Sequence, residues 1–262
     1  MYAEERQQHI EALLSTSGRV AVVDVAAELG VSTETVRRDL DHLEARGVLR
    51  RVHGGAIAAS LLGRTEESVS QRRDRNTAAK DRIAAAAMAL LPPNFTGAIA
   101  IDAGTTTGML AQRIARWQPE NAKQRLVVIT NSIHIAATVS DNPHIEIQTL
   151  GGRMRGITGA AVGATTLTQL SALRPDISFI GANGIHERFG LSTPDTEEAA
   201  VKTALTRGAQ RAVALADESK LGVESLVSFA ALSDIDMLVT DAAPDAALGE
   251  SFEAAGVEVV IA

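Results

Sequence analysis

The stretch from residue 32 to residue 56 reads STETVRRDLDHLEARGVLRRVHGGA, and it decides how the N-terminal part of the chain folds. Within it, Val36, Leu40 and Leu43 recur at helical spacing, so they form one apolar stripe. This stripe predicts a helix over residues 33–46 that turns one face toward a small core. The serine just before the helix can accept a hydrogen bond from a free backbone N–H, which marks the start of the helix.

Shorter elements surround this helix. Residues 3–16 and 23–29 show the same helical period, and a strand-like run at 19–22 lies between them. Residues 48–56 predict a two-stranded hairpin, because strand-like and basic residues there lead into a pair of glycines. Three short helices followed by a hairpin predict a winged helix-turn-helix domain over residues 1–57.

The first turns of the third helix carry the residues expected to contact DNA. Arg38 points away from the apolar stripe and Arg37 lies on its flank, and arginine suits guanine edges and phosphates. Such a pair can also be a solvated face that pairs with Glu34 and Asp41, and this alternative stays open. Asp39 lies nearer the stripe and is expected to be a structural partner. The predicted DNA-binding residues are Ser32, Thr33, Thr35, Arg37, Arg38, Arg50, Arg51 and His53.

Composition limits the remaining possibilities. The chain has 262 residues, no cysteine and a formal net charge of −7, so thiol chemistry is excluded and nucleic-acid binding requires locally clustered cations. The first residues carry acid where a secretory signal carries base, and the longest apolar run, 83–91, is far shorter than the roughly 20 residues of a membrane helix. A cytoplasmic protein without a membrane segment is therefore expected.

Two segments, TVRRDL at 35–40 and RVHGGA at 51–56, resemble the N-terminal signature of the DeoR family of bacterial regulators, and the likeness covers nearly the whole chain. The resemblance implies a repressor of sugar-catabolic operons that leaves its operator when a phosphorylated sugar binds the C-terminal domain. Further segments are similar to members that repress phosphotransferase-system sugar uptake and glycolytic genes, and they imply fructose 1-phosphate or a related glycolytic sugar phosphate as effector. These segments are 1–6, 190–193, 197–200, 226–229 and 257–262.

The C-terminal part alternates between strand-like and helical segments. After a polar, charge-mixed linker at 58–80, residues 81–262 are predicted to form a sensing domain with a mostly parallel α/β sheet covered by helices on both faces. The expected strands are 98–101, 126–130, 145–150, 177–180, 212–216, 237–240 and 257–261. The expected helices lie near 81–91, 106–116, 132–140, 161–173, 195–207 and 245–255.

Two loops in this domain have the character of phosphate sites. Asp102 and the Gly104–Thr107 turn follow a buried strand and open a helix, where free N–H groups and the helix dipole favour an anion. Thr130, Asn131 and Ser132 repeat this arrangement after the next strand. Each loop alone is commonly only a helix cap, but two at the carboxyl ends of strands favour a phosphate-ester site.

The domain also resembles the ribose-5-phosphate isomerase and glucosamine-6-phosphate deaminase group. That likeness implies that Asp102 and the glycine-threonine turn hold the phosphate and that other polar residues lie near the sugar hydroxyls. A tight turn at the two glycines and a surface charge at Lys202 are the structural alternatives. The predicted effector-binding residues are Asp102, Gly104, Thr105, Thr106, Thr107, Thr130, Asn131, Ser132, Gly151, Gly152, Arg153, Asn183, Glu197, Lys202 and Lys220.

Three classes of function remain in competition. An isomerase needs a carboxylate base, but the segment Gly181-Ala182-Asn183-Gly184 carries an amide where the isomerases carry an Asp-Gly-rich segment, and an amide cannot accept the proton. A DNA-binding protein with no small-molecule effector would use both loops as caps. We therefore predict a non-enzymatic homodimeric or homotetrameric repressor whose partners are double-stranded operator DNA and a phosphorylated sugar, with no cofactor and no catalytic or metal site.

Overall fold

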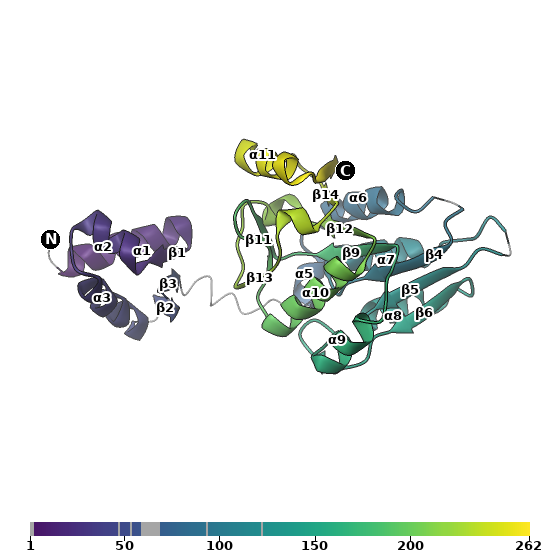
Figure 1. Cartoon of the computed structure of the whole chain (residues 1–262), viewed down its shortest axis with the longest axis horizontal. Helices are drawn as coiled ribbons and strands as arrows, with labels where there is room; N and C mark the ends of the chain where they lie inside the picture. The colour runs from purple at the N-terminus through teal and green to yellow at the C-terminus, as the bar shows by residue number, and fades with distance from the viewer. Residues whose placement is uncertain (1–2, 47, 53, 59–68, 93, 122) are drawn as a thin grey trace. The chain divides into compact units, whose positions relative to one another are not determined.

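In its described residues, the first unit of the chain combines three helices with a small antiparallel sheet (Figure 1). Its strands lie in the order β1-β3-β2, and apolar side chains such as Ile10, Val36 and Leu40 are completely buried between helices and sheet. The winged helix-turn-helix prediction is thereby confirmed. The elements are α1 (Ala3–Ser17), β1 (Arg19–Ala21), α2 (Val22–Leu29), α3 (Thr33–Ala45), β2 (Leu49–Val52) and β3 (Gly55–Ala58).

The second unit begins earlier than its sequence suggests. In the computed structural model the chain divides into Met1–Glu66 and Glu67–Ala262, and α5 (Val69–Arg73) and the start of α6 (Thr77–Met88) lie inside the predicted linker 58–80. That linker is too long at its C-terminal end, because few residues of these helices face the core and their composition is polar. The structure describes residues 3–46, 48–52, 54–58, 69–92, 94–121 and 123–262.

A seven-stranded sheet forms the centre of the second unit. All its strands are parallel, in the order β15-β14-β12-β9-β4-β5-β6. The chain builds outward from β4 to β6, returns to β9 beside β4, and then builds outward in the other direction. Such a reversal leaves a crevice at the carboxyl ends of the two central strands, where open α/β sheets bind ligands. The strands are β4 (Gly97–Ile101), β5 (Leu126–Thr130), β6 (Ile145–Thr149), β9 (Ile177–Gly181), β12 (Arg211–Leu215), β14 (Met237–Thr240) and β15 (Glu258–Ile261).

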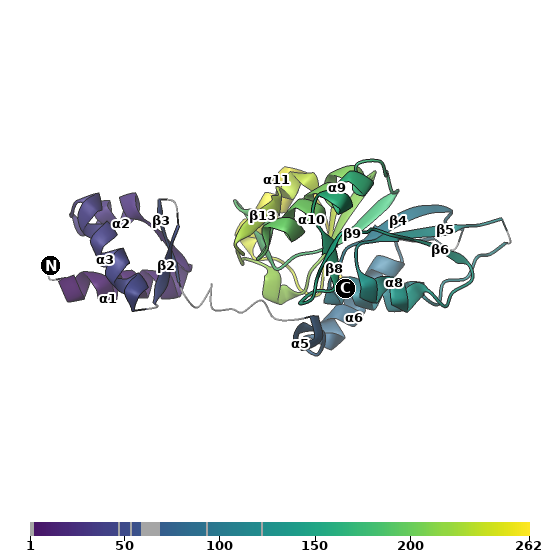
Figure 2. The ribbon, with the colours of Figure 1, turned by 90° about the horizontal axis from the view of Figure 1, so that it is seen from below.

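Helices cover both faces of this sheet, as Figure 2 shows. Because successive side chains of a strand point to opposite faces, Ile99 and Ile101 of β4 pack with α6, α7 (Thr105–Ile114) and α8 (Ile133–Val139), whereas Ala100 faces the other core. That second core is closed by α9 (Ala164–Leu170), α10 (Thr196–Gly208) and α11 (Ala246–Ala255). The prediction of a parallel sheet with helices on both faces is confirmed.

Several smaller elements lie between the strands of the large sheet in the sequence and were not expected. Two short antiparallel strands form a hairpin, three others form a separate antiparallel sheet, and two 3-10 turns complete the unit. Among the described helices, none has the length and apolar character needed to cross a membrane. The elements are β7 (Arg153–Arg155), β8 (Ala160–Val162), β10 (Gly184–His186), β11 (Gly190–Thr193), β13 (Val227–Ala230), η1 (Glu218–Lys220) and η2 (Leu232–Asp234).

Candidate functional site

The N-terminal end of α3 presents polar side chains on the surface of the first unit. Ser32 caps the helix by accepting from the Thr35 N–H at 3.2 Å, and the two hydroxyls lie 2.9 Å apart. The side chains of Arg37 and Arg38 remain 52% and 80% exposed. Both reach Glu34 only at 3.6 and 3.8 Å, and exposed pairs of this kind contribute little, so either arginine can leave for a phosphate or a base edge.

One acidic residue of α3 serves the fold. Asp39 is buried and accepts from the Arg6 guanidinium at 2.8 and 3.2 Å and from Gln7 at 3.4 Å. These contacts join α1 to α3 and hold the helix in place. The expectation that Asp39 is a structural partner agrees with this geometry.

The wing residues are in part engaged with α3. Arg51 forms an ion pair with Asp41, and its backbone N–H donates to Glu44 at 2.9 Å. Arg50 lies on β2 opposite Ile57. Of the other predicted DNA-binding residues, Thr33 is exposed at the start of α3, and His53 lies outside the described residues.

In the second unit, the helix that follows β4 starts without a side-chain cap. Its N-cap residue is Gly104, and the first turn of α7 begins at Thr105. The Thr107 hydroxyl is buried and, within the described part of the chain, has no hydrogen-bond partner. A Cβ on Gly104 would lie 2.8 Å from that hydroxyl, so glycine leaves the turn open. Free N–H groups and a spare hydroxyl at a helix N-terminus are suited to an anion.

A buried ion pair lies beside this turn, where the order of the sheet reverses. Asp102 extends the pairing of β4 with β9 by donating its N–H to Phe179, and its carboxylate pairs with Lys202 of α10. Lys202 also donates to the Gly181 carbonyl at 2.8 Å, while the Gly181 N–H donates to Asp102 at 3.2 Å. Burial raises the pKa of Asp102, against the opposing charge and hydrogen bond of Lys202. Lys202 is therefore a buried partner and not the surface charge considered as its alternative.

The loop after β5 uses its polar groups within the fold. Thr130 donates to the Ile101 carbonyl at 2.7 Å, and Asn131 accepts from the Ala103 N–H and donates to the Ala161 carbonyl, both at 3.2 Å. Ser132 caps α8 through the Ile135 N–H at 3.3 Å. These three predicted effector-binding residues thus brace the loop that holds Asp102 and Ala103.

The glycine pair after β6 forms a tight turn. Gly152 has φ +153°, and a Cβ there would meet the Thr166 hydroxyl at 2.1 Å and the Val162 carbonyl at 2.7 Å. The same hydroxyl donates to the Gly151 carbonyl at 2.8 Å. The structural alternative for this pair therefore has direct support.

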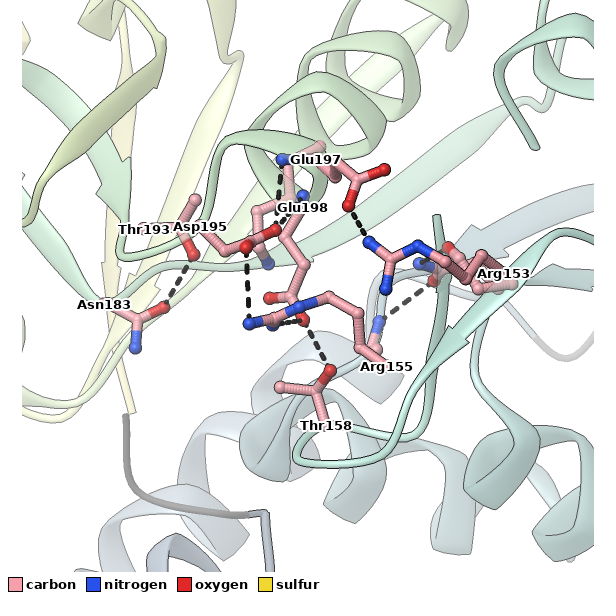
Figure 3. A network of polar contacts seen from close by, with 12 residues as sticks. Arg153, Arg155, Thr158, Asn183, Thr193, Asp195, Glu197 and Glu198 are labelled. Atoms are coloured by element: carbon pink, nitrogen blue, oxygen red, sulfur yellow. Dashed lines mark hydrogen bonds and ion pairs between the residues drawn. The ribbon is translucent and has the colours of Figure 1, made fainter. Parts of the chain in front are cut away.

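The turn of the β7–β8 hairpin is joined to the start of α10 by a network that the sequence analysis did not predict (Figure 3). Arg155 donates to Glu198 at 2.5 Å and lies 3.3 Å from Asp195, and Thr158 donates to Glu198 at 2.5 Å. Asp195 also caps α10. The partners are about 40 residues apart in the chain, and no local pattern marks them.

Figure 3 also places three predicted effector-binding residues near this network, Arg153, Asn183 and Glu197. Arg153 forms an ion pair with Glu197, both partly exposed. Asn183 accepts from the Thr193 hydroxyl at 3.2 Å, and its backbone N–H bonds to Ser192. These residues therefore have partners of their own at the carboxyl edge.

The loop after β12 is tied to the turn between α5 and α6. Asn76 donates to Asp217 at 2.9 Å, and Ser219 donates to the same oxygen at 2.5 Å. Burial opposes ionisation of Asp217, but these hydrogen bonds and the charges of Lys220 and Lys80 bring its pKa below the usual range. Lys220 thus lies close to a carboxylate at this edge of the sheet.

Lys80 is the other functional candidate that sequence reasoning missed. It is buried in α6, and its ammonium group donates to the carbonyls of Arg72 and Arg75 at 2.6 and 2.5 Å. Burial lowers the pKa of Lys80. A lysine within the alanine-rich helix 77–88 was the signal that could have revealed it.

Comparison with known families identifies both units. The DeoR-like helix-turn-helix domain matches residues 6–61, and the DeoR C terminal sensor domain matches residues 75–242. The chain belongs to the DeoR family. Its first unit is the DNA-binding domain of a transcriptional regulator of that family, and its second unit is the sensor domain.

Relatives extend over the full chain. The HTH-type transcriptional regulator GlpR of Haloferax volcanii is 36% identical, covering 99% of this chain and 98% of that protein. The HTH-type transcriptional repressor GlcR of Bacillus subtilis is 33% identical, covering 100% of this chain and 97% of that protein. The lactose phosphotransferase system repressor of Streptococcus mutans is 34% identical over 94% of both chains.

Among solved structures, the ribose 5-phosphate isomerase A of Methanocaldococcus jannaschii is 19% identical and covers 54% of this chain and 53% of its own, with a TM-score of 0.39. A score this low carries no argument about function. The assignment to the DeoR family rests on the two domain matches and on the full-length relatives.

Proposed function

We propose that this DeoR-family protein represses genes of sugar uptake or catabolism and leaves its operator when a phosphorylated sugar binds the sensor domain. Two relatives are named as repressors, and one of these names refers to a sugar phosphotransferase system. The observation that carries the effector proposal is the uncapped start of α7 at the crevice of the sheet, with the unpartnered Thr107 hydroxyl beside it.

In this proposal the phosphate lies against the first N–H groups of α7, from Thr105 to Thr107, because free amides and the helix dipole favour an anion there. Lys202 lies buried at the same edge and would hold Asp102 in position beside the ligand. Asn183, Glu197, Arg153 and Lys220 are the proposed contacts of the sugar hydroxyls. Fructose 1-phosphate or a related glycolytic phosphate is the proposed effector, since several segments of the chain resemble SugR, a repressor of phosphotransferase-system uptake and glycolytic genes.

On the DNA side, Arg37 and Arg38 of α3 would enter the major groove, with Ser32, Thr33 and Thr35 around them and with Arg50, Arg51 and His53 on the backbone phosphates. The working form would be a homodimer or homotetramer in the cytoplasm, since two-fold assemblies match paired half-sites.

Catalysis is not part of the proposal. Isomerisation of a sugar needs a base close to the substrate carbon, and Asn183 cannot accept a proton. The carboxylate that follows β4, Asp102, is already paired with Lys202. Robust turnover of a sugar phosphate by the purified protein would contradict this part.

The test is a titration of the full-length protein on its own upstream DNA with fructose 1-phosphate, fructose 6-phosphate, fructose 1,6-bisphosphate and glucose 6-phosphate. One member of this panel should release the DNA and give binding heat in calorimetry. Thr106→Ala should bind DNA normally but need more ligand for release. If no member of the panel binds or changes operator affinity, the effector proposal fails.

A second arm tests the DNA surface. Arg37→Ala or Arg38→Ala should lose about 1–3 kcal/mol of operator affinity if the arginine reads a base, with effector binding unchanged. Arg188→Ala, which removes an exposed arginine of the sensor unit, is the control. A variant that keeps full affinity and specificity removes that arginine from the interface.

A further inference from the structure

A pocket lies beside the N-terminus of α7 and draws on four parts of the sensor unit. Arg73 of α5, Gly104 and Thr105 of the α7 turn, Ser132 and His134 at the start of α8, and Thr158 of the hairpin turn all line it. Segments far apart in the sequence thus meet around the uncapped helix end.

The charges of this pocket favour an anion. None of the described residues that line it carries a carboxylate, and Arg73 supplies its one permanently positive side chain. Arg73 is exposed and, among the described residues, its guanidinium has no hydrogen-bond or ion-pair partner. A guanidinium and free helix amides that line the same pocket suit a phosphate, because the guanidinium can donate two parallel hydrogen bonds to it.

A second observation, the buried Thr107 hydroxyl, also favours a ligand at the N-terminal end of α7. The Thr107 hydroxyl is completely buried without a partner among the described groups, and it faces the backbone of Gly104. Buried hydroxyls nearly always find a partner within the protein. An anion bound at the turn would accept a hydrogen bond from the Thr107 hydroxyl and occupy the space that the missing Cβ of Gly104 leaves open.

The helix that carries Arg73 is fixed to the sensor unit at both ends. The Val69 N–H donates to the Ile157 carbonyl at 3.1 Å, in the same hairpin turn that Thr158 joins to Glu198. At the other end, Lys80 donates to the carbonyls of Arg72 and Arg75. In the sequence, α5 is the first described element of the sensor unit, after the described part of the DNA-binding unit ends at residue 58.

We infer that Arg73 is a phosphate contact of the effector site, in addition to the N-terminus of α7. Its guanidinium donates hydrogen bonds to the bound phosphate, and this contact couples ligand binding to the position of α5. This inference rests on the proposed phosphosugar sensor and adds to it the residue by which occupancy reaches the chain segment that leads to the DNA-binding unit. A ligand moves such an equilibrium only if it binds the two states differently, and the Arg73 contact supplies that difference.

The experiment uses full-length protein, the same four-member sugar phosphate panel, and the variants Arg73→Gln and Arg188→Gln. The second variant removes an exposed arginine whose guanidinium forms an ion pair with its neighbour Glu187. Calorimetry should show affinity for the active sugar phosphate about tenfold lower in Arg73→Gln and unchanged in Arg188→Gln. Arg73→Lys should recover part of the loss, because it keeps the charge without the paired donors.

Hydrogen exchange separates coupling from simple attraction. In the wild type the ligand should slow exchange in both α5 and the first turn of α7, whereas in Arg73→Gln at saturating ligand only the α7 turn should be slowed. Equal affinity and equal α5 protection in wild type and Arg73→Gln would overturn the inference and leave the proposed sensor intact. Absence of binding by the wild type to every member of the panel would overturn the proposed sensor, and the inference with it.

Discussion

The loops after β4 and β5 look alike in the sequence but differ in what their polar groups do. Both follow a buried strand, both carry hydroxyl residues and both open a helix. After β5, Thr130, Asn131 and Ser132 donate to or accept from groups of the fold, and the helix is capped by its own serine. After β4, the helix end has no side-chain cap and Thr107 has no described partner. A polar loop is available for a ligand only where the fold has not already used its donors.

A third loop, after β12, resembles the loop after β5, because its polar groups bond to other groups of the fold. Asp217 accepts from Asn76 and from Ser219, and so it ties the edge of the sheet to the α5–α6 turn. Among the described residues at these three strand ends, the helix after β4 is the one that starts without a side-chain cap. The comparison therefore separates a ligand turn from two supporting loops, and each of the following changes tests that separation.

Lys202→Ala tests whether Asp102, at the start of the β4 loop, also stabilises the fold. Of the changes considered, it should lower the free energy of unfolding most. Removing the lysine leaves Asp102 buried without its partner, and breaking a buried pair costs about 3–5 kcal/mol of the free energy of unfolding. Urea denaturation of the full-length protein measures this loss.

The pH dependence gives the control for this variant. Burial already raises the pKa of Asp102, so the unpaired carboxyl would take up a proton as the pH falls, and the neutral form needs no lysine. The deficit of Lys202→Ala should thus be greatest at neutral and alkaline pH and shrink in acid. A small, pH-independent deficit would mean that the pair does not support the loop.

Asn131→Ala tests the β5 loop and should rank second. It removes a hydrogen bond to the Ala103 N–H and another to the Ala161 carbonyl, and leaves both groups buried, at a cost of about 2–3 kcal/mol. Calorimetry below the unfolding transition should find effector affinity close to that of the wild type. A stable Asn131→Ala variant with lost affinity would make this loop a ligand site after all.

Sequence patterns were sufficient for the large sheet. Its strands are continuous apolar runs such as 126–130 and 237–240, which match the observed β5 and β14, because both faces of a parallel strand are buried. Helix α3 was equally clear, since Ser32 marks its start and a stripe of leucine and valine marks its buried face.

The smaller sheets and the site contacts were beyond such patterns. Strands β10 and β11 are three and four residues long and contain glycine, serine and histidine, so they show no clear alternation. Asp102 and Lys202 are 100 residues apart, and the sequence around neither residue predicts that they pair. The sequence likewise cannot distinguish Thr107 from Thr130, because the difference lies in whether a tertiary neighbour accepts the hydroxyl.

Asn76→Ala tests the β12 loop, with an expected cost of about 1 kcal/mol near neutral pH. The Asn76 hydrogen bond is one of the contacts that lower the pKa of Asp217. A carboxyl with a lowered pKa stabilises the fold above its unfolded value, and this contribution is lost as the pH falls through the folded value. The difference between wild type and Asn76→Ala should therefore be largest at neutral pH and fall in strong acid to a constant remainder, the cost of placing alanine at φ +51°, where asparagine is favoured. Urea midpoints across that range measure it, and a difference that does not change with pH would show that the hydrogen bond to Asp217 contributes nothing.

Thr107→Val should change the free energy of unfolding least. The sign of that change is informative, because it shows whether the fold uses the Thr107 hydroxyl. The hydroxyl is buried without a partner, so replacing it by a methyl group of similar size removes an uncompensated desolvation cost and should leave the unfolding free energy unchanged or raise it by up to about 1 kcal/mol. If the hydroxyl is held in reserve for phosphate, the same change should weaken sugar phosphate binding. Thr130→Val is the matched control: it removes a hydroxyl that donates to Ile101, so it should lose stability and keep its affinity. Opposite outcomes for two threonines at neighbouring strand ends would separate a group kept for a ligand from one used by the fold, whereas a loss of stability in both variants would make the turn after β4 a support like its neighbour.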